Sequence, residues 1–169
     1  VFDGRRAIGV RLADGDTIPA DHVVLAAGAI HSPAILLRSR VDTPGVGTGL
    51  QDHPSAPFTL LMRDGAAASP GQLAIGTLLQ RDPWQFLPMN HLGVAAPGLG
   101  LLMAALMRPH GRAGTVRLAS DDPTIDPQVD FALLDDQRDV TSLAAAVRVA
   151  LDLLATPPFR EVVEEVYID

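Results

Sequence analysis

The stretch 23-VVLAAGAIHSPAILL-37 decides the fold class of this chain, because an apolar run breaks at a glycine and then restarts. Residues 22–27 are apolar without alternation, which predicts a strand covered on both faces in an α/β sheet. Gly28 ends that strand. Ser32 suits the N-cap and Pro33 the first turn of a short helix. Strand, glycine turn and capped helix together predict a β–α unit that contacts a nucleotide.

Composition limits the class of protein. Of the 169 residues, 47% are hydrophobic and 20% are charged, which is typical of a globular chain with a sizeable core. The formal charge of −7, with no basic cluster, argues against binding to nucleic acid or an anionic membrane. The absence of cysteine excludes disulfides, thiolate nucleophiles and zinc ribbons. All basic residues are arginine, a bias that fits GC-rich bacterial coding.

Membrane insertion and secretion are not expected. The longest apolar stretch, GLGLLMAALM, is shorter than the roughly 20 residues that cross a bilayer as a helix. The first ten residues, VFDGRRAIGV, show no signal-peptide pattern. We therefore expect a cytoplasmic protein without a membrane span. The first residues also read as a strand entered midway, which suggests a fragment.

Turn chemistry predicts several strands. Residues 6–12 alternate apolar and polar positions before Asp14-Gly15, which predicts a hairpin. Residues 43–57 are rich in proline and glycine and predict a long irregular loop, a kind of loop that is usually functional. Residues 58–63 predict a strand.

The middle of the chain is less regular. Residues 64–98 have little periodicity and give no firm assignment. Residues 99–109 fit either a strand or a buried helix. A strand is favoured, because residues 114–120 follow a glycine-containing connection and would pair with it.

The C-terminal part predicts a long helix. Asp135 or Asp136 offers an N-cap, and Pro157-Pro158 ends the helix before a last short helix over residues 159–166. Apolar residues recur at helical spacing on one face. These are Val140, Leu143, Val147, Leu151 and Leu154.

Three segments together resemble one known family. ADHVVLAAGAIHSPAILLRS (20–39) resembles the second signature region of the glucose–methanol–choline (GMC) flavoprotein oxidoreductases. PGVGTGLQDHP (44–54) is similar to the loop that follows it in that family, although Gly49 stands where the family commonly has Asn. Residues 114–155 look like a later segment, in which a strand and an Asp-Pro turn precede a long helix. The three matches occur in family order.

The resemblance implies a mixed α/β (α+β) fold shared between two domains. Residues 1–57 would form part of a Rossmann-type FAD-binding domain. Residues 58–134 would form part of a substrate-binding domain built on an antiparallel sheet, and residues 135–169 a helical segment packed on it.

The resemblance also implies a cofactor, FAD, and the residues near it. A glycine allows close approach of the backbone, and a helix N-terminus attracts negative charge. From the residues alone, a tight turn without a ligand is the alternative. For Asp52 and His53, the alternative is an Asp that orders a turn and a His that hydrogen-bonds to backbone. The predicted cofactor-binding residues are Ala27, Gly28, Ala29, Ser32, Pro33, Asp52 and His53.

Two family features have no counterpart in the chain. One is the Gly-x-Gly-x-x-Gly fingerprint that holds the pyrophosphate, and the other is the C-terminal catalytic histidine. No catalytic residue or metal ligand is therefore assigned, and the remaining histidines are expected to be surface or loop residues. Those are His22, His31, His91 and His110.

Together these features predict the central fragment of an FAD-dependent oxidoreductase. The parent enzyme would act on the CH–OH group of a small-molecule alcohol and transfer hydride to the flavin. The fragment alone would not be catalytically competent, and its partners would be the missing parts of the parent chain. The alternative is a non-catalytic remnant, or a partner-dependent fragment, without redox activity.

Overall fold

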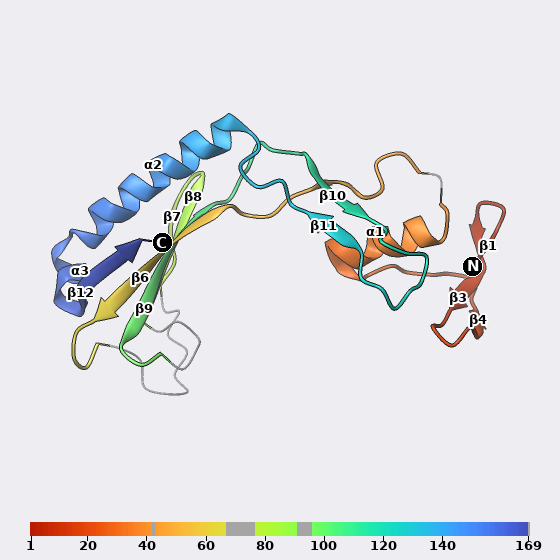
Figure 1. Cartoon of the computed structure of the whole chain (residues 1–169), viewed down its shortest axis with the longest axis horizontal. Helices are drawn as coiled ribbons and strands as arrows, with labels where there is room; N and C mark the ends of the chain where they lie inside the picture. Colours follow the sequence, from red (N-terminus) through yellow and green to blue (C-terminus); the bar gives the residue numbers. More distant parts are fainter. Residues whose placement is uncertain (42, 67–76, 91–95, 169) are drawn as a thin grey trace. The chain divides into compact units, whose positions relative to one another are not determined.

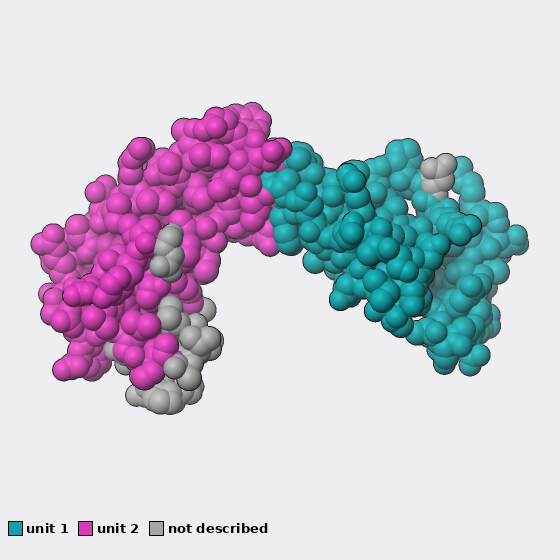
Figure 2. All heavy atoms as spheres, viewed as in Figure 1, with its two compact units in different colours: residues 1–51, 112–132 teal, residues 52–111, 133–169 magenta. Residues whose placement is uncertain are grey.

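The computed structural model has a mixed α/β fold, so the predicted fold class is confirmed, and among the residues described below every strand pair is antiparallel. It forms two compact units, each built from two separate stretches of sequence (Figure 2). Unit 1 comprises residues 1–51 and 112–132, and unit 2 comprises residues 52–111 and 133–169. The residues described are 1–41, 43–66, 77–90 and 96–168.

Two small hairpins begin unit 1. Strands β1 (Phe2–Asp3) and β2 (Arg6–Ala7) form the first, and β3 (Gly9–Arg11) and β4 (Thr17–Pro19) form the second. The turn between β3 and β4 uses Gly15 at φ +97°. The predicted hairpin is confirmed, because local turn chemistry is enough to specify it.

A helix and a three-stranded sheet make up the rest of unit 1. Helix α1 spans Gly28–Arg38. The sheet has the order β11 (Gln128–Asp130), β10 (Gly114–Arg117), β5 (Thr48–Leu50). A Cβ at Gly114 would lie 2.2 Å from the Leu50 carbonyl oxygen, so this strand pair requires glycine there. The Arg38 guanidinium donates to the Ile125 carbonyl, which ties the end of α1 to the loop after β10.

Unit 2 is a five-stranded sheet with a helix on one face (Figure 1). The strand order is β12 (Val163–Ile168), β6 (Ser55–Met62), β9 (Leu99–Leu106), β8 (Trp84–Met89), β7 (Leu79–Arg81). Helix α2 (Gln137–Leu154) lies along this sheet, and the short helix α3 (Pro157–Val162) leads into β12.

The core of unit 2 lies between the sheet and α2. Alternate residues of β6 and β9 face the helix, as the two-residue period of a strand requires. In the register of these strands, Phe58 lies opposite Leu102 and Ala56 opposite Ala104. The buried cluster is Phe58, Leu60, Met62, Phe86, Leu102, Ala104, Leu143, Ala146, Ala150, Leu154 and Val163.

The predicted strand at residues 22–27 differs from the structure. Within the described residues this segment pairs with no strand, and Val24 is 87% exposed. A strand covered on both faces requires neighbouring strands to satisfy its N–H and C=O groups. The apolar composition was read correctly, but the partners that would bury it are not among the described residues.

The start of the first helix also differs. Ser32 is not an N-cap and Pro33 is not in the first turn, because α1 already begins at Gly28 and Pro33 lies inside it. The positive φ of Gly28, +77°, lets the chain turn directly into the helix. Pro33 leaves the Ala29 carbonyl without its helical donor, but that carbonyl lies in the exposed first turn, where water can satisfy it.

The strand expected at residues 99–109 is confirmed as β9, but its partner was wrong. It pairs with β6 and β8, and β10 instead pairs with β5 and β11 in the other unit. Closeness in sequence does not decide strand pairing when the chain leaves one unit for the other between the two strands.

The strand at residues 58–63 is confirmed as β6, which begins earlier, at Ser55. In the predicted loop 43–57, β5 adds a short strand. In the unassigned region 64–98, the structure forms β7 and β8, while residues 67–76 and 91–95 lie outside the described set.

The long C-terminal helix is confirmed, with Asp136 as its N-cap. The expected stripe is only partly buried: Val140 is 37% exposed and Leu151 41%. The helix instead packs through small residues, which permit close approach to β9. Its buried face is Asp139, Leu143, Ala146, Ala150 and Leu154.

The short helix expected at 159–166 is wrong beyond Val162, because the chain becomes β12 and pairs with β6. The domain boundaries expected at 57 and 134 stay a prediction. In the structure, residues 112–132 group with the N-terminal segment.

Candidate functional site

The first turn of α1 is shaped by Gly28. Its φ is +77°, and no atom lies within 4 Å of the position that a Cβ would take. Ala27, Gly28 and Ala29 are all exposed. The Ala27 N–H donates to Ser32 Oγ at 3.1 Å, so the serine holds the entry to the helix from one turn further along.

This turn is suited to a negatively charged group. The N-cap Ala27 provides no side-chain cap, and the first turn contains no acidic residue. The partial positive charge of a helix N-terminus is therefore not offset by a carboxylate of its own. The glycine leaves space for close backbone approach, so this segment fits the phosphate portion of a dinucleotide.

Asp52 and His53 begin unit 2, whereas Ala27 to Pro33 belong to unit 1. Asp52 Oδ1 accepts the backbone N–H of His53 at 2.8 Å, and both residues are exposed. Pro54 is buried, and its carbonyl accepts the N–H of Leu106 at 2.9 Å. Asp52 thus orders the turn at His53, and the cofactor-proximal role of both residues stays a prediction.

The sequence reasoning missed a buried carboxylate. The side chain of Asp139 is 1% exposed, and its oxygens accept the N–H groups of His110 at 2.8 and 3.0 Å and of Gly111 at 2.9 Å. His110 Nδ1 lies 3.0 Å from Asp139 Oδ1. The available signal was an aspartate in register with Leu143, Ala146 and the rest of the apolar face.

The environment of Asp139 favours its charged form. Burial by itself raises the pKa of the carboxyl group, but the hydrogen bonds from His110 and Gly111 outweigh this and hold the pKa below its ordinary value. Nearby, hydrogen bonds from the side chain and N–H of Arg138 lower the pKa of the half-buried N-cap Asp136. Both carboxylates therefore stay charged at neutral pH.

The face of the sheet opposite α2 carries apolar, half-buried side chains on its central strands, beside the polar side chains of Thr59 and Gln85 and the exposed side chains of Glu165 and Tyr167 on β12. Along the strands, its residues alternate with those of the core and lie opposite one another in register, Leu87 with Met103, Met89 with Leu101, and Leu61 with Leu99. We call this set the outer face. It comprises Leu61, Leu87, Met89, Leu99, Leu101 and Met103.

A hollow of about 410 Å³ lies elsewhere on unit 1, beside α1 and β10. Its volume falls in the range of small-molecule sites. None of the predicted cofactor residues lines it, and the lining is mainly apolar without a buried polar side chain to orient a ligand. It is lined by Leu37, Val46, Gly47, Thr48, Thr115, Val116, Arg117 and Leu118.

Among the other histidines, His22 and His31 are exposed, and His91 lies outside the described residues. In the described part of the chain, no group of three or more His, Cys, Asp or Glu side chains could hold a metal ion. No helix there is long and apolar enough to cross a bilayer. The cytoplasmic location stays a prediction.

Comparison with solved structures defines the class of fold. The chain superposes on formate oxidase from Aspergillus oryzae with a TM-score of 0.78 and 20% identity, covering 96% of this chain and 43% of that one. It also matches pyridoxine 4-oxidase from Mesorbium loti with a TM-score of 0.81 and 21% identity, covering 98% of this chain and 39% of that one. The fold is therefore the one found in these two oxidases.

Sequence comparison gives the family. Sequence models of the GMC oxidoreductases match residues 1–55 and 109–168, together more than half of the chain. The chain belongs to the GMC oxidoreductase family. The predictions of the family and of its cofactor, FAD, are thereby confirmed at the level of the family.

Two curated relatives show how much of a family member is present. The chain is 36% identical to 5-(hydroxymethyl)furfural oxidase from Methylovorus sp., over 83% of this chain and 31% of the relative. It is 29% identical to oxygen-dependent choline dehydrogenase from Escherichia coli, over 93% of this chain and 38% of the relative. The chain thus spans about a third of the length of these relatives.

Proposed function

We propose that this chain is part of an FAD-dependent oxidoreductase that oxidises the CH–OH group of a small alcohol. The observation that carries the proposal is the placement of the two family segments. The N-terminal segment contains the α1 turn, and the C-terminal segment contributes β10, β11, α2 and β12. Both relatives described above are named for the oxidation of an alcohol-bearing compound.

Unit 1 would contribute one side of the FAD site. The N-terminal turn of α1 offers backbone N–H groups, space at Gly28 and no competing carboxylate. Bound FAD would supply the acceptor for the hydride that leaves the alcohol carbon. The residues Ala27 to Ala29 would hold the dinucleotide, with Ser32 and Pro33 supporting their turn, and no base for the hydroxyl proton is assigned within this chain.

Unit 2 would contribute a wall of the substrate site. Its outer-face residues, on the central strands, have aliphatic and thioether side chains, which favour contact with an apolar or aromatic body, whereas the charged Glu165 on this side of the sheet lies on the edge strand β12. We therefore propose that the alcohol carries an apolar body next to its CH–OH group. Leu101 and Met103, on the central strand β9, are the residues that we expect to contact it.

The test is anaerobic bleaching of the flavin absorbance in the full-length gene product, with a panel of primary alcohols that differ in apolar bulk. Wild-type protein should contain FAD and bleach, and alcohols with an apolar body should bleach fastest. Flavin that no alcohol reduces would contradict the proposed reaction. Equal rates across the panel would contradict only the role of the outer face.

Gly28→Val tests the cofactor placement, because the added side chain fills the space of a close backbone approach. Gly65→Val is a matched control, since Gly65 has φ +78° and likewise no atom within 4 Å of a Cβ. Both variants strain a turn with positive φ, but only Gly28→Val should lose bound FAD. Equal flavin content in the two variants would place the cofactor elsewhere.

The second candidate is a fragment without redox activity that depends on a partner. The observation in its favour is the exposed apolar segment before α1, where Val24 is 87% exposed and Leu25 is 39% exposed. FAD content and anaerobic bleaching of the full-length gene product separate the two cases, because only the first candidate expects bound flavin that an alcohol reduces. The 169-residue chain alone should bind little FAD in either case, because the contacts proposed at Ala27 to Ala29 would reach only one side of the dinucleotide.

A further inference from the structure

Asp139 stands out because it is a buried charge that the proposed chemistry does not use. Among the residues that the structure describes, it is the charged residue assigned to the interior, with a side chain 1% exposed. Burying a carboxylate is unfavourable unless hydrogen bonds compensate. Here both oxygens are engaged by two consecutive residues, His110 and Gly111, through their N–H groups and the imidazole.

The chain at Gly111 lies in van der Waals contact with the carboxylate as well as hydrogen-bonded to it. A Cβ at Gly111 would lie 3.4 Å from Asp139 Oδ2, so the chain passes directly over the carboxylate. Backbone N–H donors to a charged acceptor form some of the stronger hydrogen bonds in proteins. Residues 110–111 are therefore fixed to the first turn of α2 by bonds that a neutral side chain could not reproduce.

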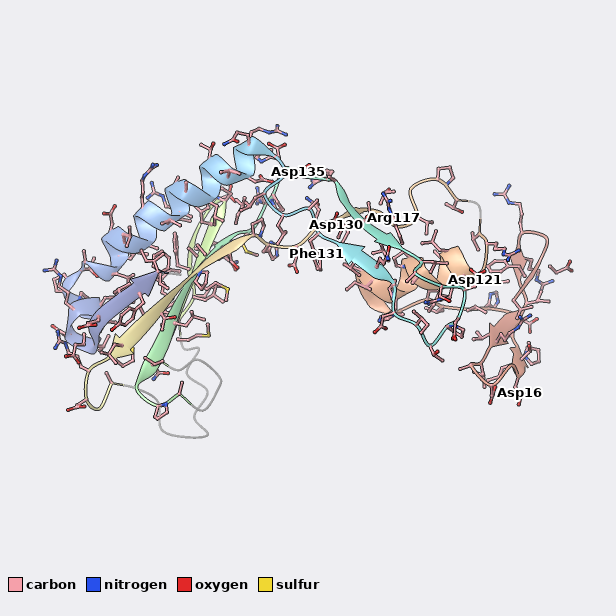
Figure 3. The ribbon with its side chains drawn as sticks, in the orientation of Figure 1. Asp16, Arg117, Asp121, Asp130, Phe131 and Asp135 are labelled. Carbon is pink, nitrogen blue, oxygen red and sulfur yellow. The ribbon has the colours of Figure 1, made fainter. Side chains whose placement is uncertain are left out.

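The hydrogen bonds between Asp139 and residues 110–111, which we call the clamp, lie where the chain passes between the two units. Gly111 is the last residue of unit 2 before the chain enters unit 1, and the chain re-enters unit 2 at Leu133, just before α2. The returning segment runs from Asp130 and Phe131 to Asp135 (Figure 3). Asp139 therefore bonds residues 110–111, where the chain leaves unit 2, to helix α2, which begins just after the chain returns to unit 2.

We propose that Asp139 is a positioning residue, which makes these two connections leave unit 2 from one fixed point. In the function proposed above, on which this inference rests, unit 1 holds cofactor contacts and unit 2 holds substrate contacts. A fixed exit from unit 2 would limit the range of arrangements that the two units sample.

Amide hydrogen exchange in the 169-residue chain tests the clamp directly. In Asp139→Asn the amide NH₂ replaces one acceptor oxygen and faces a donor N–H. The amides of His110 and Gly111 should then exchange more than tenfold faster, while amides of β9 keep their protection. Asp152→Asn, an exposed site on the same helix, should exchange like the wild type. Unchanged exchange in Asp139→Asn would overturn the proposal.

Distances between spin labels, measured by electron spin resonance, test whether Asp139 limits the range of arrangements of the two units. The absence of native cysteine makes labelling straightforward. One label pair spans the units, at Arg117→Cys on β10 (labelled in Figure 3) and Arg148→Cys on α2. The control pair lies within unit 2, at Arg81→Cys and Arg148→Cys. Adding Asp139→Asn should broaden the distance distribution at least twofold for the first pair only.

Equal widths for the spanning pair would overturn the positioning role, and broadening of both pairs would show a merely structural role. If Asp139→Asn does not fold, His110→Ala removes only the imidazole bond and should give a partial effect in both measurements. Wild-type behaviour of that variant would then overturn the proposal. Neither measurement involves flavin, so failure of the proposed function would leave both results readable.

Discussion

Replacing Leu102 by alanine should destabilise unit 2 far more than the same replacement at its neighbour Leu101. Leu102 is 0% exposed and lies on the central strand β9, opposite Phe58 on one side and Pro88 on the other. Leu101 is half-buried on the outer face. The two residues share a strand, a residue type and a backbone environment, so they differ mainly in the face they occupy.

The loss in free energy of unfolding follows from burial. Leu→Ala in a fully buried core costs about 2–5 kcal/mol, and Leu102→Ala, at a site enclosed by three strands and α2, should cost about 3–4 kcal/mol. Leu101 should lose about 1 kcal/mol, roughly half the transfer free energy of its side chain. For a unit of about 100 residues, the first loss lowers the melting midpoint by roughly 12–30 °C.

Urea unfolding followed by tryptophan fluorescence measures both losses, because the chain contains one tryptophan. Trp84 lies on β8 against the core of unit 2, and its Nε1–H donates to Ser142 Oγ at 3.0 Å. Equal losses for Leu101→Ala and Leu102→Ala would show that the two faces of β9 are assigned wrongly. The proposed substrate wall would then fail together with the packing argument.

Three further outcomes are expected. The pKa of Asp139 is lowered in the folded state, so its ionised carboxylate stabilises the fold fully above the unfolded pKa of about 4, and this stabilisation is lost as the pH falls through the folded pKa. The urea midpoint of unfolding should therefore fall from pH 6 to pH 2, and it should fall less steeply in Asp139→Asn. Gly114→Ala should disrupt the pairing of β10 with β5, since its Cβ would meet the Leu50 carbonyl oxygen at 2.2 Å, and faster exchange of the Leu50 region with no change in Trp84 fluorescence would check it. Ser142→Ala should cost about 1 kcal/mol in the urea assay, by removing the acceptor of the Trp84 indole, and an unchanged midpoint would show that water replaces it.

The candidate site shows how far local chemistry reaches. The resemblance pointed to the turn at Gly28, and the structure gives that residue a positive φ and free space at the start of α1. The exact role of Ser32 could not be predicted from the sequence, because a serine suits an N-cap and also a position one turn inside a helix. Only the backbone path distinguishes them.

What the sequence by itself determined are the features set by neighbours along the chain. The hairpin around Gly15 and an N-cap at Asp135 or Asp136 depend on contacts within a few residues. What only the tertiary structure decided depends on distant segments. The partners of β9 and the alanine face of α2 required knowing which surface each element meets. The burial of Asp139 is the sharpest case, because an aspartate becomes stable in a core only when N–H donors from a segment 28 residues away reach it.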